Sequence, residues 1–292
     1  NSVFHTASIS KLFTAIAIMQ LIEKGKLTLD DKLVDILPEL KYWDKNVENI
    51  NINIKNLLNH TSGIPDINNY HWDNNNQADN SLEEYISGLN LQLDFEPSSE
   101  YSYSNLAYNI LGYVIEKVSK TSFEDYVKRN IFDPAGMNNS DFRYFKIPDA
   151  LRTSPHSKSK LTGDIYIRET YPYTREHAGS STLNASSKDL CKWMNSFLNA
   201  LENNNSGNNY KSMLEPTFDA NKHIGLGFQL SAIDGFKTVG HYGGDKGFRS
   251  YLMMIPEKKV GLILLANCDY NEDFRQEIVH TIASLILAET KE

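Results

Sequence analysis

Residues 8–24 read SISKLFTAIAIMQLIEK. The apolar residues of this run recur at intervals of three and four, which predicts an amphipathic helix from Ser8 to about Lys24, and Gly25 follows where such a helix would end. Side chains at positions i and i+3 share one helix face, so this helix would place the Ser8 hydroxyl beside the Lys11 amine. The run therefore predicts a long packed helix and a reactive pair of side chains at its start.

The Ser8–Lys11 pair has the chemistry of an activated nucleophile. A serine hydroxyl needs a base at neutral pH, and a desolvated lysine with a depressed pKa can be that base. Unpaired N–H groups at the helix N-terminus would favour a developing oxyanion. On this pattern alone, an N-cap serine followed by a solvent-facing lysine explains the residues equally well. The same spacing recurs at Ser157 and Lys160, in a polar stretch that we interpret as solvated surface.

A second candidate segment is Tyr103-Ser104-Asn105, just before a predicted helix. A tyrosine held near a lysine can lose its proton below its usual pKa of about 10 and then shuttle protons to and from a leaving group. The asparagine amide can both donate and accept hydrogen bonds. Ordinary capping of the following helix is the competing explanation for these residues.

The third candidate segment, His241-Tyr242-Gly243-Gly244, ends a predicted strand, where an exposed edge could bind an extended substrate. The glycines would let an acyl group come close, and the Gly244 N–H could complete an oxyanion hole with that of Ser8. His177 and His223 are also followed two residues later by glycine, but only His241 lies between two predicted strands.

The remaining sequence predicts an α+β fold in which an antiparallel sheet is flanked by helices and joined to a mainly helical subdomain. Helical patterns start at residue 54 and cover 106–118, 123–131 and 188–200. Short β-type runs separated by turns predict an antiparallel meander at 228–232, 236–241, 248–255 and 260–267. A final amphipathic helix at 274–288 would cover one face of this sheet.

We expect two subdomains with a cleft between them, where ligands commonly bind. Residues 1–50 and 185–292 would form the sheet-and-helix subdomain, and residues 51–184 the mainly helical one. The segment 27–37 and the Asn-rich stretches 68–80 and 203–209 predict loops without a functional signature.

The composition excludes several classes of protein. With 29 basic and 37 acidic residues the chain has a charge of −8, which would repel a polyanion, so we expect no nucleic-acid partner. The longest apolar stretches, 12–22 and 278–288, are too short to cross a bilayer, and we expect no transmembrane segment. Cys191 and Cys268 fit buried thiols better than a bridge. The scattered histidines predict no metal site, and nothing predicts a cofactor.

Taken in order, the three segments resemble the signature set of the serine β-lactamase and penicillin-binding protein superfamily, which pairs Ser-x-x-Lys with a second and a third motif. With Tyr-Ser-Asn and His-Tyr-Gly in those places, the chain looks like the branch of class C β-lactamases, D-alanyl-D-alanine carboxypeptidases, D-aminopeptidases and related esterases. Three further segments also look like family sequence, at 57–65, 95–112 and 131–137.

The resemblance implies a serine hydrolase that acts through an acyl-enzyme on a small-molecule or peptide substrate with a reactive amide, β-lactam or ester carbonyl. It implies that Ser8 is the nucleophile and that Lys11 and Tyr103 move protons. It assigns the substrate amide to Asn105 and the cleft edge to His241 and Gly243. No residue matches the glutamate that class A enzymes use for deacylation, so the Tyr103 and Lys11 side would activate water.

The chain also departs from the family pattern. Pro97-Ser98 stands where Pro-Gly is common, and Gly179-Ser180 where Gly-Gly is usual, which suggests altered turns. Two sheet strands usually precede the Ser-x-x-Lys helix. None is predicted here, so we expect an unpaired sheet edge and a segment ahead of Asn1. A histidine in the third motif would be charged only near or below pH ~6.5, so a preference for carboxylate substrates would weaken above it.

One alternative from another class stays open, namely a catalytically silent sensor or binding protein that keeps the cleft. The resemblance favours export to the periplasm or the cell exterior, without excluding the cytoplasm. It leaves open the natural substrate, the acceptor of the acyl group and the oligomeric state.

Overall fold

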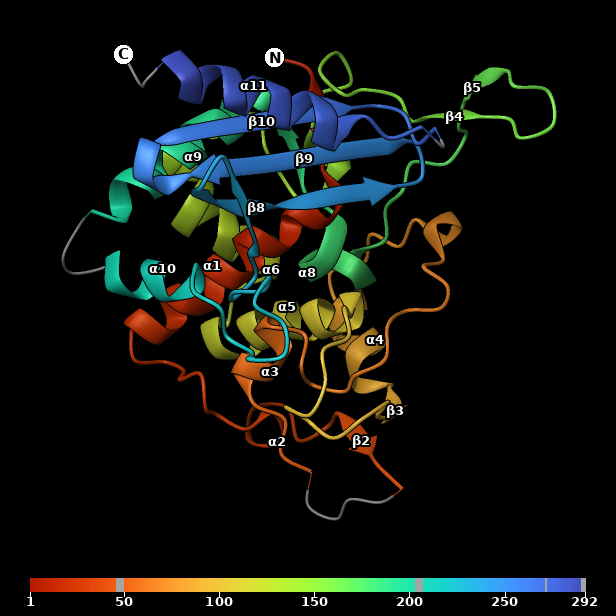
Figure 1. The fold of residues 1–292 in the computed structure, drawn as a ribbon. Coiled ribbons are helices and arrows are strands. Elements are labelled where there is room, and N and C mark those ends of the chain that lie inside the picture. Colours follow the sequence, from red (N-terminus) through yellow and green to blue (C-terminus); the bar gives the residue numbers. More distant parts are fainter. Residues whose placement is uncertain (46–49, 203–206, 271, 290–292) are drawn as a thin grey trace.

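The computed structural model describes residues 1–45, 50–202, 207–270 and 272–289. Within these ranges a sheet lies at one end of the molecule, helices fill the other, and α1 (Ser10–Glu23) runs between them (Figure 1). This arrangement confirms the predicted α+β class. The predicted loop at 203–209 falls largely outside the described residues, and α10 (Gly207–Met213) begins within it.

The main sheet among the described residues is a four-stranded antiparallel meander in the order β10-β9-β8-β7. Gly235 and Gly247 supply the positive φ angles, 85° and 86°, that its tight hairpin turns need. The strands follow the predicted meander closely, except that β8 continues past its predicted end at His241. Their bounds are Gln229–Ile233 for β7, Phe236–Asp245 for β8, Phe248–Ile255 for β9 and Val260–Ala266 for β10.

The second half of β8 has one free edge. β7 pairs only with the first half of β8, from Ile233 opposite Phe236 to Gln229 opposite Gly240. On its other side, β8 stays paired with β9 as far as Asp245. Among the described residues the β8 segment 241–245 therefore lacks a strand partner on the β7 side, and this segment holds the third candidate motif.

α1 is buried on nearly every side, from Ser10 to Leu21, and near its C-terminal end Gln20 and Ile22 are half-buried and Glu23 is exposed. It packs against α5 (Asn105–Ser119) and α8 (Ala178–Ser181). A helix that is apolar all round is typical of a central position. The prediction of an amphipathic helix from Ser8 is therefore wrong in two respects, because residues 7–9 form a separate 3-10 turn, η1, before α1 begins.

Helices cover both faces of the sheet. α9 (Ser187–Ala200) packs on β10 from one side, and α11 (Arg275–Glu289) packs on β9 and β10 from the other (Figure 1). Val279, Ala283 and Leu287 form the buried face of α11. The apolar side chains on and just before α11 that remain exposed are Phe274, Ile278, Ile282 and Leu285.

Short strands form three smaller pairs. β1 (Val3–His5) pairs antiparallel with β6 (Asn184–Ser186), β2 (Lys41–Trp43) pairs parallel with β3 (Asn90–Gln92), and β4 (His156–Lys158) pairs antiparallel with β5 (Ile165–Ile167). A strand therefore does precede α1. Among the described residues it joins β6 and leaves β10 as the outer strand of the main sheet, so the predicted unpaired edge is present.

Two stretches interpreted as solvated loops are partly buried. In the Asn-rich stretch 68–80, Trp72 is buried. The Tyr70 and Trp72 rings stack with their centroids 5.1 Å apart, and both rings pack against His177. Ser157 is buried in β4 and accepts a hydrogen bond from Arg168, whereas Lys160 is exposed. Ser157 and Lys160 thus do not form a second reactive pair.

The remaining helical elements connect these parts. The α-helices are α2 (Leu33–Ile36), α3 (Ile54–Leu58), α4 (Ser81–Ser87), α6 (Phe123–Val127) and α7 (Asp133–Ala135). The 3-10 turns are η2 (Trp72–Asn74), η4 (Tyr144–Lys146), η5 (Arg175–His177) and η6 (Pro256–Lys258), and η3 (Lys128–Phe132) is a π-helical turn.

Candidate active site

A strained turn presents Ser8 against β8 and β9. Ala7 has a φ of 49°, in the left-handed region that costs a residue with a side chain about 1–2 kcal/mol. Hydrogen bonds hold the turn in place: Ser10 Oγ donates to Ala7 O at 2.7 Å, and the Leu183 N–H donates to Ser10 Oγ at 2.9 Å. Strain that the surrounding structure maintains in this way is common at functional sites.

The Lys11 side chain is fully buried, and its amine meets three oxygen atoms. Nζ lies 3.1 Å from Ser8 Oγ, 2.6 Å from Asn105 Oδ1 and 2.9 Å from Ser180 O. The turn η1 and the helices α5 and α8 therefore converge on this amine. A solvent-facing lysine, the alternative that the sequence left open, is excluded.

Burial lowers the pKa of Lys11 to about 7, so much of the amine is neutral at neutral pH. A neutral amine has two N–H donors and one lone pair. Asn105 Oδ1 and Ser180 O have no proton to give and can only accept, so they take the two N–H groups. The lone pair is left for the hydroxyl proton of Ser8. These contacts are what a general base for Ser8 requires.

Tyr103 lies next to the pair with its proton in place. Its phenol hydrogen-bonds Ser8, and the centre of its ring lies 4.9 Å from Lys11 Nζ and 4.5 Å from the His60 ring. Burial raises the pKa of Tyr103 well above its ordinary value. The prediction of an easily ionised phenol is therefore wrong, because loss of solvent raises the pKa of Tyr103 more than the hydrogen bond with Ser8 lowers it.

Asn105 is the first residue of α5, and its amide is occupied at both ends. Oδ1 accepts from Lys11, while Nδ2 lies 3.2 and 3.1 Å from the two carboxylate oxygens of Asp66. The backbone N–H of Asn105 donates to Asp66 Oδ1 at 2.7 Å. Ser104 caps the helix by accepting from the Ala107 N–H.

His241 is buried and neutral. Burial, together with the nearby Lys11 charge, lowers the pKa of His241 to about 3. Nδ1 contacts Tyr242 O, and a carbonyl only accepts, so Nδ1 holds the proton and Nε2 is left as an acceptor. The expected change in carboxylate preference near pH ~6.5 is therefore wrong, because the ring does not titrate there.

Gly243 lies directly against the Ser8 turn. A Cβ at this position would lie 2.3 Å from Thr6 O and 3.2 Å from the Ser8 backbone nitrogen, so a side chain would force the strand and the turn apart. Glycine thus allows β8 to approach Ser8 closely.

The Gly244 N–H points to the free edge of β8. Two residues earlier, the Tyr242 N–H donates to Gln229 Oε1 at 3.1 Å, across that edge. In an antiparallel strand, N–H groups two residues apart point to the same side. The Gly244 N–H is therefore directed to the same side as that of Tyr242, beyond the end of β7.

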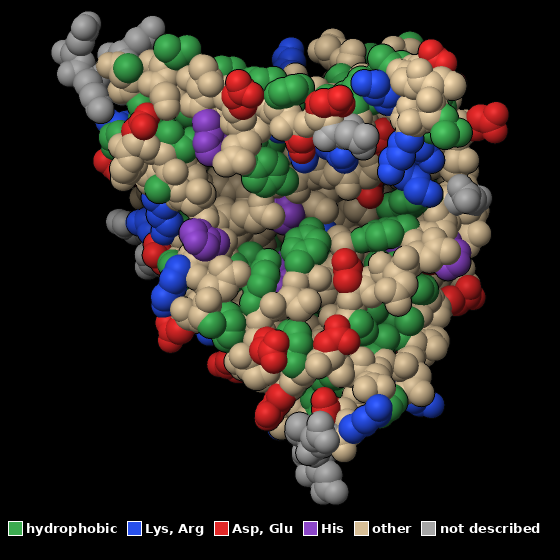
Figure 2. All heavy atoms as spheres, turned by 45° about the vertical axis from the view of Figure 1, so that its right-hand side comes forward, with side chains coloured by type: hydrophobic (Ala, Val, Ile, Leu, Met, Phe, Trp, Pro, Cys, Tyr) green, Lys and Arg blue, Asp and Glu red, His purple; other side chains and the backbone are tan. Residues whose placement is uncertain are grey.

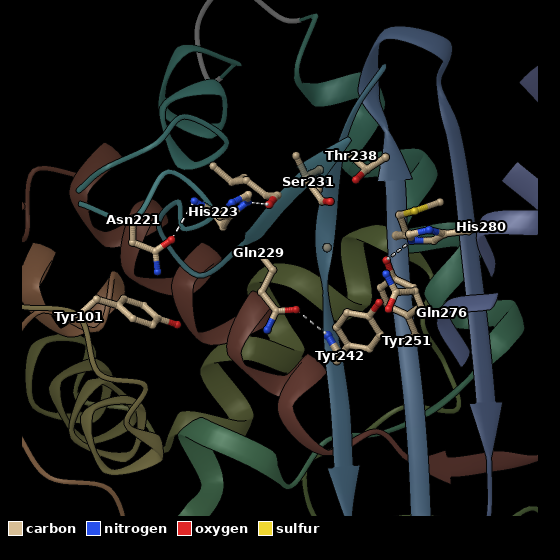
Figure 3. A pocket seen from close by; sticks show the side chains of 14 residues that line it. Tyr101, Asn221, His223, Gln229, Ser231, Thr238, Tyr242, Tyr251, Gln276 and His280 are labelled. Carbon is tan, nitrogen blue, oxygen red and sulfur yellow. Dashed lines mark hydrogen bonds between the residues drawn. The ribbon is translucent and has the colours of Figure 1, made fainter. Parts of the chain in front are cut away.

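A cavity of about 380 Å³ opens beside Tyr242 of this edge and extends along the paired part of β7, β8 and β9. Figure 3 shows Gln229 near its middle, with Tyr101 on one side and Tyr242 and Tyr251 on the other. Among the described residues that line it, none is Lys, Arg, Asp or Glu; hydroxyls, amides, imidazoles and aromatic rings surround the space together with the apolar side chains of Leu230, Val239 and Met253. Figure 2 shows that this face of the molecule is hollowed across its middle, with histidine side chains in and beside the hollow.

The structure thus brings every predicted site residue to one place, although they are spread from residue 8 to residue 244. It adds residues that the sequence did not single out. Asp66 follows directly on the family-like segment 57–65, His60 lies within that segment and Asp245 follows Gly244, but their order along the chain does not place them at the site. Only the folded chain shows Asp66 facing Asn105, His60 against Tyr103, and Asp245 2.9 Å from His5 Nε2.

In the part of the chain that the structure describes, no cluster of three or more His, Cys, Asp or Glu side chains could hold a metal ion. Within the same residues, no helix has the length and apolar character needed to span a bilayer.

The fold and the convergence of these side chains on one buried lysine define a protein of the β-lactamase and transpeptidase-like class. The chain belongs to the Beta-lactamase family, whose model matches residues 1–285.

Several relatives share most of this chain. A penicillin-binding protein of Bacillus subtilis (strain 168) is 28% identical over 99% of the chain and 66% of its own length. Protein flp of Staphylococcus aureus (strain N315) is 28% identical over 97% of the chain and 56% of its own length. The chain therefore spans about two thirds or less of the length of these relatives.

Solved structures agree on the fold. An octameric penicillin-binding protein homologue from Pyrococcus abyssi has a TM-score of 0.75 at 29% identity, covering 91% of this chain and 62% of its own. The D-amino acid amidase of Ochrobactrum anthropi SV3 has a TM-score of 0.79 at 20% identity, covering 99% and 85%. At that identity the second likeness shows the fold alone.

Proposed function

We propose that the protein is a serine hydrolase that forms an acyl-enzyme at Ser8 on an amide or ester carbonyl. One observation is central: the buried amine of Lys11 has two acceptors for its N–H groups and its lone pair is left for the Ser8 hydroxyl. Membership of the Beta-lactamase family supports the same reading.

In the acylation step, Ser8 Oγ attacks the carbonyl carbon and its proton moves to the Lys11 lone pair. The oxyanion accepts hydrogen bonds from the Ser8 and Gly244 N–H groups. Collapse of this intermediate breaks the bond to the leaving nitrogen or oxygen. Tyr103, a neutral phenol, donates the proton that the leaving group needs and recovers one from the Lys11 ammonium.

In the deacylation step, water replaces the leaving group. Its proton passes to the neutral Lys11 amine, its oxygen attacks the ester carbon, and Ser8 Oγ departs and regains a proton. The cycle consumes one water molecule and releases a carboxylic acid, so the reaction balances without a cofactor.

The cavity beside β8 favours neutral substrate groups. Its described lining has no Lys or Arg to attract a carboxylate, and the neutral His241 next to it offers no cation. Amides and hydroxyls on its walls can pair with substrate amides, and its tyrosine rings with apolar groups. We propose neutral amides and esters in preference to carboxylate-bearing β-lactams.

Covalent labelling tests this proposal. A fluorophosphonate probe should label the native protein, and a fluorescent penicillin, which carries a carboxylate, should label it more weakly. Ser8→Ala should abolish both signals and lower hydrolysis of p-nitrophenyl esters by at least ~10³-fold. Ser157→Ala is the matched control, because Ser157 is also followed by a lysine three residues later. Native protein that no probe labels would favour the silent binding protein instead.

A further inference from the structure

The segment 60–66 runs beside residues 102–105 and places Asp66 at the start of α5. The Ser102 N–H donates to His60 O at 3.0 Å, and the Ser104 N–H donates to His60 Nδ1 at 3.1 Å. Ser104 Oγ donates to Pro65 O at 3.2 Å. Asp66 is therefore fixed one residue beyond a well-anchored stretch, facing Asn105.

We propose that Asp66 is a positioning residue that locks the Asn105 amide with Oδ1 toward Lys11 and so aims the Lys11 lone pair at Ser8. The carboxylate can only accept, so it selects the amide orientation that turns Nδ2 toward Asp66 and Oδ1 toward Lys11. Tyr70 also hydrogen-bonds the Asn105 side chain.

The amide orientation decides what Lys11 can do. With Oδ1 toward Nζ, the neutral amine uses one N–H on Asn105 and one on Ser180, and its lone pair remains for Ser8. If the amide were reversed, its NH2 group would face the amine and take the lone pair. The base would then be unavailable although every side chain was still present. This inference rests on the proposed function of Ser8 and Lys11.

It also changes the role expected for Asn105. The resemblance assigns Asn105 to the substrate amide, yet its side chain already contacts Lys11, Asp66 and Tyr70 in the free protein. In this chain Asn105 therefore acts mainly on Lys11, and Asp66 acts through it.

A simple capping role for Asp66 is the competing explanation. Asp66 accepts from the first backbone N–H of α5, where a negative charge stabilises a helix. Loss of a cap would lower thermal stability without releasing the Asn105 amide, whereas loss of the Asp66 charge shifts the titration of Lys11 in either case. The experiment must therefore read the titration and the amide directly.

The titration of Lys11 depends on more than one neighbour. The carboxylates of Asp245 and Asp66 both raise the Lys11 pKa against the larger lowering by burial. The other titratable groups that face or couple to Lys11 from the surrounding elements are His60, Tyr103, Tyr108, His177 and His241.

We therefore compare Asp66→Ala, which removes both charge and acceptor, with Asp66→Asn, which removes the charge but keeps an oxygen acceptor. Asp245→Asn is the matched control, because it removes a second nearby charge that does not contact Asn105. Three quantities are measured for each folded variant: the Lys11 side-chain titration by NMR, the Asn105 side-chain amide signals, and the rate of fluorophosphonate labelling.

Asp66→Ala should release the Asn105 amide and slow labelling by about 10²-fold, the effect expected of a misaligned catalytic group. Asp66→Asn should lose less than about 10-fold and shift the Lys11 titration to lower pH, because a stabilising negative charge is gone. Asp245→Asn should shift the titration in the same direction and leave the Asn105 amide signals unchanged.

A double-mutant cycle decides between positioning and capping. If Asp66 acts through Asn105, adding Asp66→Ala to Asn105→Ala should slow labelling by less than about 2-fold beyond Asn105→Ala alone. The inference would be overturned if the two substitutions slowed labelling additively. It would also be overturned if Asp66→Ala protein kept the native labelling rate and the native Asn105 signals. Native protein that titrates as described but is never labelled would instead refute the proposed function while leaving the positioning role intact.

Discussion

At the scale of single residues, burial decides the protonation states that the sequence leaves open. Lys11, Tyr103 and His241 are all enclosed, and burial disfavours the charged form of each. A lysine becomes a usable base under these conditions, whereas a tyrosine stays protonated and a histidine stays neutral. In the proposed mechanism, this one physical cause suits Lys11 to act as the base and Tyr103 as a proton donor.

The pH dependence of activity should follow Lys11. Because the Lys11 pKa is lowered to about 7, protonation below that pH removes the lone pair, so kcat/KM should rise about tenfold per pH unit on the acid side and level off above pH ~7. Measurement of kcat/KM against pH with a neutral p-nitrophenyl ester tests this rise.

Histidine ordinarily titrates near neutral pH, so His241 is the other residue that could cause this rise in kcat/KM, and His241→Asn is the control. Because the pKa of His241 is lowered to about 3, kcat/KM of the His241→Asn variant should rise over nearly the same pH range as that of the native protein, whatever its absolute rate. If the rise in kcat/KM disappears in His241→Asn, it is caused by the imidazole, which would contradict its assignment to Lys11.

The convergence of the candidate site residues could be predicted from the sequence, but their protonation states could not. Ser8, Tyr103 and His241 are recognisable because each belongs to a short motif in a known order. The exposure of a phenol or an imidazole depends on which segments fold over it, and spacing along the chain does not contain that information. Asp66 was missed for the same reason, since only the folded chain shows that it faces Asn105.

At the scale of elements, turn conformations explain which residues are under strain. Ser98 has a φ of 71° in the turn before α5, where the family pattern has glycine. Its hydroxyl accepts a hydrogen bond from Asn56 Nδ2 at 2.8 Å. The serine thus combines backbone strain with a favourable side-chain contact, and the two effects can be separated by substitution.

Ser98→Gly should be more stable than Ser98→Ala. Both variants lose the bond to Asn56, but only glycine relieves the left-handed backbone, so the free energy of unfolding should differ by about 1 kcal/mol in favour of glycine. Thermal melting would show this as a Tm difference of about 2–4 °C. Equal Tm values for the two variants would show that the turn relaxes without strain.

The elements themselves were largely predictable from periodicity and turn residues. The strands β7 to β10 and the helices α5, α9 and α11 begin and end within a few residues of their predicted bounds, apart from the longer β8. The prediction failed for α1, because a helix buried on all sides and an amphipathic helix share the same apolar positions at spacing three and four. Only the packing of α5 and α8 against α1 distinguishes them.

At the scale of the whole molecule, a buried ion cluster ties the helical region to the site. Arg175 in η5 contacts Glu116 of α5 and Glu124 of α6, and all three side chains are largely buried. Two residues later, His177 donates to Tyr70 O at 2.9 Å, and α8 then supplies Ser180 O to Lys11. The segment that Arg175 anchors therefore positions one of the acceptors of Lys11.

Replacement of Arg175 should be strongly destabilising. Arg175→Met would leave Glu116 and Glu124 buried without their cation, which typically costs about 3–5 kcal/mol in the free energy of unfolding. Chemical denaturation at pH 7 measures this loss. Lys128→Met is the control, because Lys128 and Asp133 form an exposed pair whose removal should cost less than about 0.5 kcal/mol.

The pH dependence of this loss identifies its cause. Burial already raises the pKa of Glu116 above its ordinary value, and without Arg175 it should rise further. A carboxyl whose pKa is raised in the folded state binds its proton more tightly there than in the unfolded chain, so lowering the pH toward that pKa stabilises the fold. Arg175→Met should therefore recover part of its lost stability between pH 7 and pH 5, relative to native protein measured at the same pH. A loss that stays constant over this range would mean that lost packing around the arginine, and not the unpaired carboxylate, is responsible.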